Sequence, residues 1–118
     1  MKTLFLTVYK EAFDVMITCE KQREYRKPSK WILSRLFNKD GSRKHIDVVR
    51  FNNGYGNVPF FACVYKGFFF SDKKYTQVYS NGLKVNIEPG DIIIKLGRII
   101  ESNLEHKLFL DGTLYKKQ

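Results

Sequence analysis

The first part of the chain alternates short apolar runs with amphipathic stretches. Residues 3–8 are apolar and rich in Thr and Val, a composition that predicts a short strand. Residues 9–18 place their apolar side chains three and four positions apart, which predicts a helix with one apolar stripe. Residues 21–27 alternate polar types around a single aromatic, Tyr25, and favour a strand that makes few apolar contacts.

A second helix is predicted to begin after Pro28 and Ser29, because Pro and Ser are typical of the first positions of a helix. Its apolar residues recur at helical spacing as far as Phe37. Trp31 falls in this helix, and we interpret it as part of the core. The Asn-Lys-Asp-Gly-Ser cluster at residues 38–42 indicates a turn that ends the helix.

The second part of the chain is typical of strands. Strands are predicted over the apolar runs at residues 46–51, 60–70 and 92–100. Both alternating faces of the second of these runs are apolar, as expected of a strand buried on both sides. Segments rich in Gly, Asn, Asp and Pro indicate loops and turns at residues 52–57, 81–82, 88–91 and 111–112. Five or six short strands with two early helices predict an α+β fold built on a closed or nearly closed small β-barrel, in a single domain over residues 1–118.

Composition excludes several classes of protein. A hydrophobic fraction of 43% and an aromatic fraction of 15% exclude a disordered basic tail. No apolar run approaches the roughly 20 residues that span a bilayer, and the opening apolar segment is too short for a secretory signal. Cys19 and Cys63 do not suggest a disulfide scaffold, and both are interpreted as buried structural thiols. We therefore expect a soluble cytoplasmic domain with no membrane partner.

Positive charge is concentrated in one segment. The chain has 21 Lys and Arg against 12 Asp and Glu, a net charge of +9. Residues 20–50 hold ten of these cations and four acids, so this segment alone carries 10 − 4 = +6. Clustered positive charge attracts polyanions and favours a nucleic-acid partner. The alternative is that a small domain keeps its net charge away from zero.

Three charged residues follow the first predicted helix at close spacing. On a strand, Glu24 and Arg26 lie on the same face, where the carboxylate can hold the guanidinium aimed at a phosphate or a base edge. Lys21 is positioned to act as a point charge for phosphate. The alternative is a structural Glu–Arg bridge on a solvated strand, with Lys21 as an ordinary surface residue.

The predicted loop after residue 51 carries a second candidate group. The amides of Asn52 and Asn53 suit a base edge, and an exposed Tyr55 can stack on an unpaired base. The alternative is a tight turn in which Asn tolerates left-handed geometry and Tyr55 covers the end of the barrel.

Both segments resemble the ASCH domain family of the PUA-like barrel superfamily. The family signature, G-x-K-x-x-E-x-R, is matched at Lys21, Glu24 and Arg26, while Cys19 stands where the family usually has glycine. Residues 50–55 are similar to the R-F-x-N-G-Y motif of small bacterial and phage members. The resemblance covers roughly the first 70 residues, and the later strands only in their general layout.

The resemblance implies a pseudo-barrel whose signature segment lines a cleft between the barrel and the helices. It also implies binding of RNA or of a modified nucleotide, with an oligomeric state that the sequence does not give. The expected nucleic-acid-binding residues are Lys21, Glu24, Arg26, Arg50, Asn52, Asn53 and Tyr55.

Two other functions stay open. One branch of the family is an amidohydrolase acting on acetylated cytidine, but its nucleophilic Thr is replaced here by Glu24, and ribonuclease activity is ascribed to other members. If the protein is a hydrolase, Lys21 and Glu24 are the candidate general base and acid. His45 and His106 lie far apart and lack a ligand pattern, so neither a metal nor a cofactor is expected. A domain that binds an acidic protein is the third hypothesis.

Overall fold

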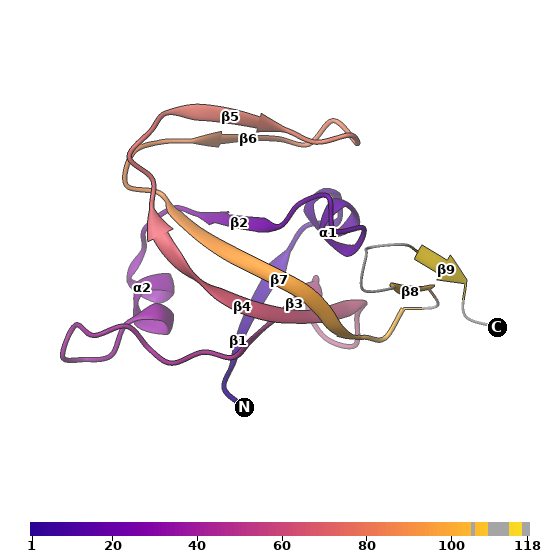
Figure 1. Ribbon diagram of the computed structural model, residues 1–118, viewed down its shortest axis with the longest axis horizontal. Coiled ribbons are helices and arrows are strands. Elements are labelled where there is room, and N and C mark those ends of the chain that lie inside the picture. Colours follow the sequence, from indigo (N-terminus) through magenta and orange to yellow (C-terminus); the bar gives the residue numbers. More distant parts are fainter. Residues whose placement is uncertain (105, 109–113, 117–118) are drawn as a thin grey trace.

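The computed structural model describes residues 1–104, 106–108 and 114–116. This part of the chain forms two helices and nine strands, whose arrangement is drawn in Figure 1. In chain order they are β1 (Thr3–Val8), α1 (Lys10–Ile17), β2 (Arg23–Arg26), α2 (Lys30–Leu36), β3 (Val48–Asn53), β4 (Phe60–Phe70), β5 (Tyr75–Val78), β6 (Lys84–Ile87), β7 (Ile92–Ser102), β8 (His106–Leu108) and β9 (Leu114–Lys116).

Five of these strands form one mixed sheet in the order β1-β3-β4-β7-β2. The β1–β3 pair is parallel, and the other three pairs are antiparallel. The sheet curls into a half-barrel whose two edge strands are β1 and β2 (Figure 1). The fold is therefore α+β and barrel-like, as the sequence predicts, with β5–β6 and β8–β9 as separate two-stranded ribbons.

The curl depends on the two long central strands, β4 and β7, each of 11 residues. Their register shifts between Cys63 and Tyr65 and again between Tyr65 and Phe68. Such irregularities bend a strand and increase its twist. Gly97 of β7 lies in this region, where an added Cβ would approach the Cβ of Val64 to 3.0 Å. A glycine here lets the two strands stay close through the bend.

The core fills the concave side of the sheet and is covered by the helices. Phe51 of β3 and Phe61 of β4 are both fully buried, and their ring centroids lie 5.3 Å apart. Phe13 of α1 packs on Phe61 at the same centroid distance of 5.3 Å. From α2, Ile32 and Leu36 enter the core.

Both helices form where the sequence predicts them. α1 starts directly after β1 and buries Phe13, Met16 and Ile17 of the predicted stripe together with Val15, whereas Tyr9, which the stripe includes, is exposed. The side chain of Ser29 caps α2 by accepting a hydrogen bond from the backbone N–H of Ile32 at 3.2 Å. The predicted start at Pro28 and Ser29 is confirmed.

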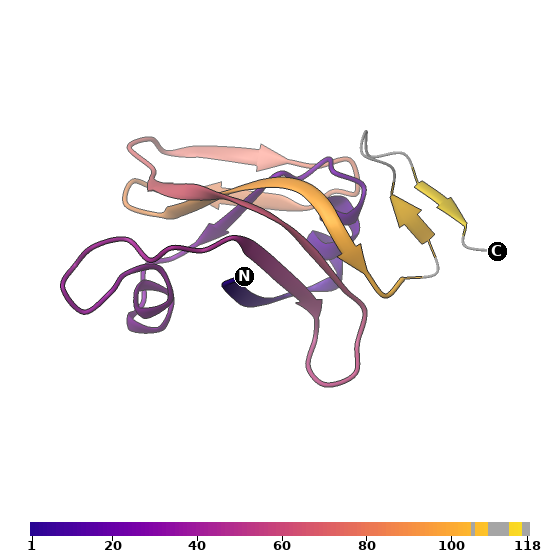
Figure 2. The ribbon, with the colours of Figure 1, turned by 60° about the horizontal axis from the view of Figure 1, so that its bottom comes forward.

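The β5–β6 hairpin lies on the β2 side of the half-barrel (Figures 1 and 2). Its turn is attached to the region of α1, because Glu20 accepts a hydrogen bond from the backbone N–H of Ser80 at 2.7 Å. The Asn81 side chain also donates to the carbonyl of Glu11 at 2.9 Å. The hairpin thus covers β2 and holds Tyr79 beside Tyr25.

Several details differ from the prediction. Trp31 is 47% exposed and not part of the core, because it lies about 100° around α2 from Ile32. Asn52 and Asn53 belong to β3 and not to the loop that follows. β4 is not buried on both sides throughout, since Lys66 and Phe70 are exposed. The turn predicted at residues 111–112 lies outside the described residues.

Within residues 1–104 and the short strands that follow, no helix is both long and apolar enough to cross a membrane.

Candidate functional site

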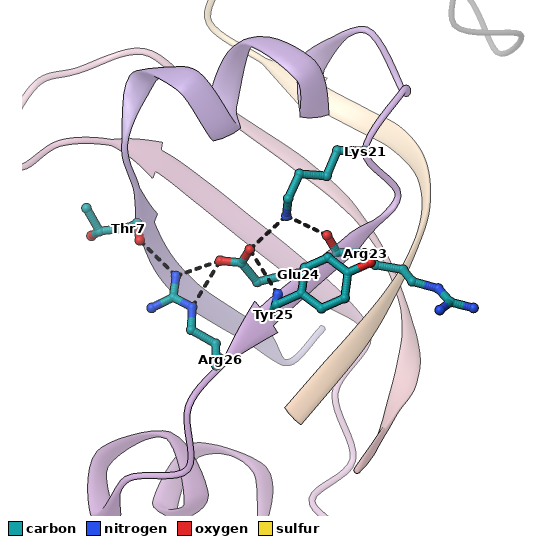
Figure 3. Close-up of polar contacts among 6 residues, drawn as sticks. All are labelled: Thr7, Lys21, Arg23, Glu24, Tyr25 and Arg26. Atoms are coloured by element: carbon teal, nitrogen blue, oxygen red, sulfur yellow. Dashed lines mark hydrogen bonds and ion pairs between the residues drawn. The ribbon is translucent and has the colours of Figure 1, made fainter. Parts of the chain in front are cut away.

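The candidate site begins with a buried ammonium group next to β2. Lys21 lies in the segment between α1 and β2, and its side chain is only 2% exposed. Its Nζ donates to Glu24 Oε1 at 2.9 Å and to the carbonyl of Arg23 at 2.5 Å (Figure 3). The same Nζ lies 5.2 Å from the centroid of the Tyr25 ring. Lys21 is therefore a buried partner of Glu24 and not a free surface charge for phosphate.

The Glu24 carboxylate connects the motif residues and is 7% exposed. Oε1 accepts from Lys21 and, at 3.2 Å, from the backbone N–H of Tyr25. Oε2 accepts from Arg26 Nε at 3.0 Å and forms an ion pair with Arg26 Nη2 at 2.8 Å. Glu24 and Arg26 thus share one face of β2, as predicted from the alternation of side chains along a strand. A buried carboxylate with two cationic partners is a satisfied network that fixes the conformation of both.

Arg26 extends from this network to the opposite edge of the sheet. Its Nη2 donates to the carbonyl of Thr7 on β1 at 2.8 Å (Figure 3). Its Nη1 has no hydrogen-bond partner within the described part of the chain. The side chain remains 26% exposed, so a guanidinium held on one side presents N–H donors on the other.

An open groove of about 700 Å³ lies next to Arg26 and is called here the aromatic groove. Its walls come from β1, the start of α1, β2, α2, the end of β3 and the loop that follows β3. They are formed by Phe5, Thr7, Val8, Tyr9, Lys10, Arg26, Trp31, Asn53, Gly54 and Tyr55.

Four of the wall residues are aromatic and exposed, namely Phe5 at 57%, Tyr9 at 87%, Trp31 at 47% and Tyr55 at 88%. Large aromatic side chains usually lose water contact on folding, so four of them around one groove mark a surface that can bind a flat apolar ligand. No Asp or Glu of the described residues lines this groove. The groove therefore combines aromatic surface with two cations, Lys10 and Arg26, each of which also pairs with a carboxylate outside the groove wall.

The predicted site residues divide into three places. Arg26, Asn53 and Tyr55 line the aromatic groove. Lys21 and Glu24 are buried and hold Arg26 in place. The remaining two, Arg50 and Asn52, lie elsewhere.

Arg50 and Asn52 lie on the outer face of β3, because Phe51 between them points into the core. Arg50 Nε donates to Asn52 Oδ1 at 3.2 Å, and its guanidinium carbon lies 3.6 Å from the centroid of the Phe60 ring. These two residues form a local pair and do not line the aromatic groove. The loop prediction nevertheless holds at Gly54, whose φ of +99° turns the chain so that Tyr55 reaches the groove.

Sequence reasoning missed Phe5, Tyr9 and Trp31. A signal for Phe5 was present, since it alternates with the core residues Leu4 and Leu6 and must point away from them. Trp31 lies beside the apolar stripe of α2 and not within it. Neither pattern shows that these side chains meet across a groove.

The two thiols are not placed as nucleophiles. Burial and, to a smaller extent, the neighbouring Cys19 raise the pKa of Cys63 to about 12. Burial also raises the pKa of Cys19, which is half-buried and not fully buried as predicted. Both thiols are protonated at neutral pH and therefore weakly reactive. Among the described residues, no three His, Cys, Asp or Glu side chains come close enough to hold a metal ion.

Comparison of the chain with protein-family models, with curated proteins and with solved structures finds no match.

Proposed function

We propose that the protein binds single-stranded RNA and places an unpaired base in the aromatic groove beside Arg26. The observation that carries the proposal is the position of the Arg26 guanidinium, which Glu24 and Thr7 hold in place. Its Nη1 has no hydrogen-bond partner among the described residues, and the side chain lines a groove with four exposed aromatic residues. Exposed aromatic side chains stack on unpaired bases, and a fixed guanidinium binds a phosphate or a base edge. Asn53 adds an amide that suits a base edge.

The resemblance to the ASCH family agrees with this site, and we propose membership of that family. The resemblance implies a cleft lined by the signature segment, and Arg26 of that segment lines the aromatic groove, which supports the proposal. Cys19 occupies the position of the signature glycine, and its φ is +65°. A positive φ is easier for glycine than for a residue with a side chain, which gives a physical reason for a glycine at this position of the signature.

Binding is favoured over hydrolysis by the burial of both candidate catalytic groups. A general acid or base must come within about 2.6–3.2 Å of the proton that it transfers. Lys21 and Glu24 are 3% and 6% exposed, and they are bonded to each other and to β2. In this arrangement Arg26, and not Lys21 or Glu24, faces a ligand in the groove.

The single Trp of the chain provides a direct assay. Because Trp31 lines the aromatic groove, a base that stacks there is expected to change its fluorescence. Labelled single-stranded RNA is titrated at two salt concentrations, and Tyr55→Ala is expected to weaken binding by about 1–3 kcal/mol. Lys84→Ala, which removes an exposed cation on β6 outside the groove, is the control.

Absence of both a fluorescence change and salt-dependent binding overturns the proposal. If the wild type and the Tyr55→Ala variant bind the RNA with equal affinity, the aromatic groove is not the binding site. The same RNA, and acetylated cytidine, are then analysed for products by chromatography. Turnover that is lost in Glu24→Gln would replace the binding function with a hydrolase.

A further inference from the structure

A second open groove, of about 770 Å³, continues from the aromatic groove along β1. Phe5 and Trp31 line both grooves, so the two meet at these side chains. The new groove lies between the N-terminal end of β1, α2 and the segment that follows α2, which Figure 2 shows on the same side of the molecule. It is called here the basic groove, after the cations in its wall, Lys2, Arg35, Arg43 and Lys44.

These cations lack neutralising partners. In the described part of the chain, no Asp or Glu lines the basic groove, and none forms a salt bridge with these four side chains. Asp47, three residues after Lys44, accepts from the backbone N–H of Lys2 at 2.9 Å, and its Oδ1 lies 2.9 Å from His45 Nε2. Unpaired cations that converge on a concave surface focus a positive potential there.

Two of the cations are also placed by aromatic rings. The Arg35 guanidinium lies 5.1 Å from the centroid of the Trp31 ring. Arg43 lies 4.1 Å from the Phe68 ring centroid and donates to the carbonyl of Phe68 at 2.5 Å. Such contacts limit the motion of a long side chain and keep its charge at the groove.

We propose that the basic groove binds the backbone phosphates of the same strand whose base occupies the aromatic groove. The inference rests on the proposed function and names its ligand as an oligonucleotide rather than a single nucleotide. β1 lines the basic groove with Thr3, Leu4 and Phe5, a run of about 10 Å at roughly 3.3 Å per residue, along which more than one phosphate can lie. Trp31 stands at the junction, where it separates the base site from the phosphate track.

The neighbouring aromatic groove favours a nucleic-acid strand over an acidic peptide. A single strand presents bases and phosphates in alternation, and this chain presents exposed rings and unpaired cations along one continuous surface. An acidic peptide matches the cations but offers no bases for the exposed rings.

The test compares a mononucleotide with a single-stranded RNA hexamer, using Trp31 fluorescence at salt concentrations from 50 to 200 mM. The hexamer is expected to bind at least about tenfold more tightly and with a steeper salt dependence, because each phosphate contact contributes about −0.7 to the slope of log K against log salt. In Lys2→Gln/Lys44→Gln, the hexamer slope is expected to fall in magnitude by about 1.4, with mononucleotide affinity unchanged. The matched control, Lys84→Gln/Lys95→Gln, removes two exposed cations outside both grooves.

Each result decides between the two proposals. The phosphate track is wrong and the base site stands if the mononucleotide binds as tightly as the hexamer. The same conclusion follows if the Lys2→Gln/Lys44→Gln variant binds the hexamer with the salt dependence of the wild type. If neither ligand binds, the proposed function itself fails. A hexamer of glutamate that binds with the affinity of the RNA hexamer would also overturn the track and identify an acidic protein as the partner.

Discussion

Arg26 Nη2 donates to the backbone carbonyl of Thr7 at 2.8 Å, and this bond joins the two edge strands of the sheet. β1 and β2 do not pair with each other, so the half-barrel is bridged here by a side chain instead of a ladder of backbone hydrogen bonds. The same guanidinium faces the aromatic groove. One residue therefore links the shape of the barrel to the position of the candidate site.

Replacing Arg26 with Lys is expected to lower the free energy of unfolding even though the charge is retained. Arg26 reaches Glu24 and Thr7 with two different nitrogens of a planar fork, and a lysine, which donates from a single nitrogen, is expected to lose one of these bonds. Loss of one hydrogen bond to a charged group costs about 1–3 kcal/mol, measurable by urea denaturation. RNA affinity is expected to fall as well.

Arg23→Lys is the control for that measurement. Arg23 lies on the same strand, but its side chain is exposed and points away from Glu24 (Figure 3). Its replacement is expected to change stability by no more than about 0.5 kcal/mol. Equal effects of the two substitutions would show that Arg26 does not bridge the edges.

Lys21→Met is expected to act on stability and not on phosphate binding. The substitution removes one cation from a buried carboxylate and keeps a side chain of similar length. Breaking a buried ion pair by removing one partner costs about 3–5 kcal/mol, and Arg26 limits this cost because it still pairs with Glu24. If the Lys21→Met variant is as stable as the wild type and its RNA binding depends less steeply on salt concentration, Lys21 contacts a phosphate after all.

The Cys63 thiol is expected to make the protein less stable at high pH. Its folded-state pKa of about 12 lies above the ordinary thiol value of 9.0, because burial disfavours the thiolate. The unfolded chain therefore loses this proton first, so the stabilisation is complete below about pH 9 and is lost as the pH rises toward 12.

The contribution of Cys63 is isolated by comparison with Cys63→Ala, because Tyr and Lys side chains also titrate in this range. The stability difference between the wild type and this variant is expected to shrink by about 1.4 kcal/mol per pH unit above pH 9. A constant difference from pH 8 to 11 would show that the thiol ionises normally.

Local patterns were sufficient for most of the fold. The helix starting at Ser29, the strand at Thr3–Val8 and the sharing of a face by Glu24 and Arg26 each depend on residues that are neighbours in sequence. The bend of β4 against β7 was not predictable, because it depends on register shifts between strands about 30 residues apart.

The site was predictable only in part, for the same reason. Glu24 and Arg26 belong to one strand, but the partner of Arg26 is a backbone carbonyl 19 residues away. Lys21 follows a helix in a basic segment and resembles a surface residue in the sequence, but in the fold its side chain is buried beside Glu24. The aromatic groove combines side chains from β1, α2 and β3, and only the curled sheet brings these together.

Cys19→Gly is expected to stabilise the protein. Cys19 is the only non-glycine residue of the described chain with a positive φ, at +65°. A side chain at positive φ costs roughly 1–2 kcal/mol, and glycine avoids this cost. Glycine also makes the unfolded chain more flexible, which offsets part of the gain in stability. Cys19→Ala keeps the strain and removes only the thiol, so it is the matched control. The glycine variant is expected to exceed the alanine variant by about 1 kcal/mol in urea denaturation, and an alanine variant of equal stability would show that this backbone is unstrained.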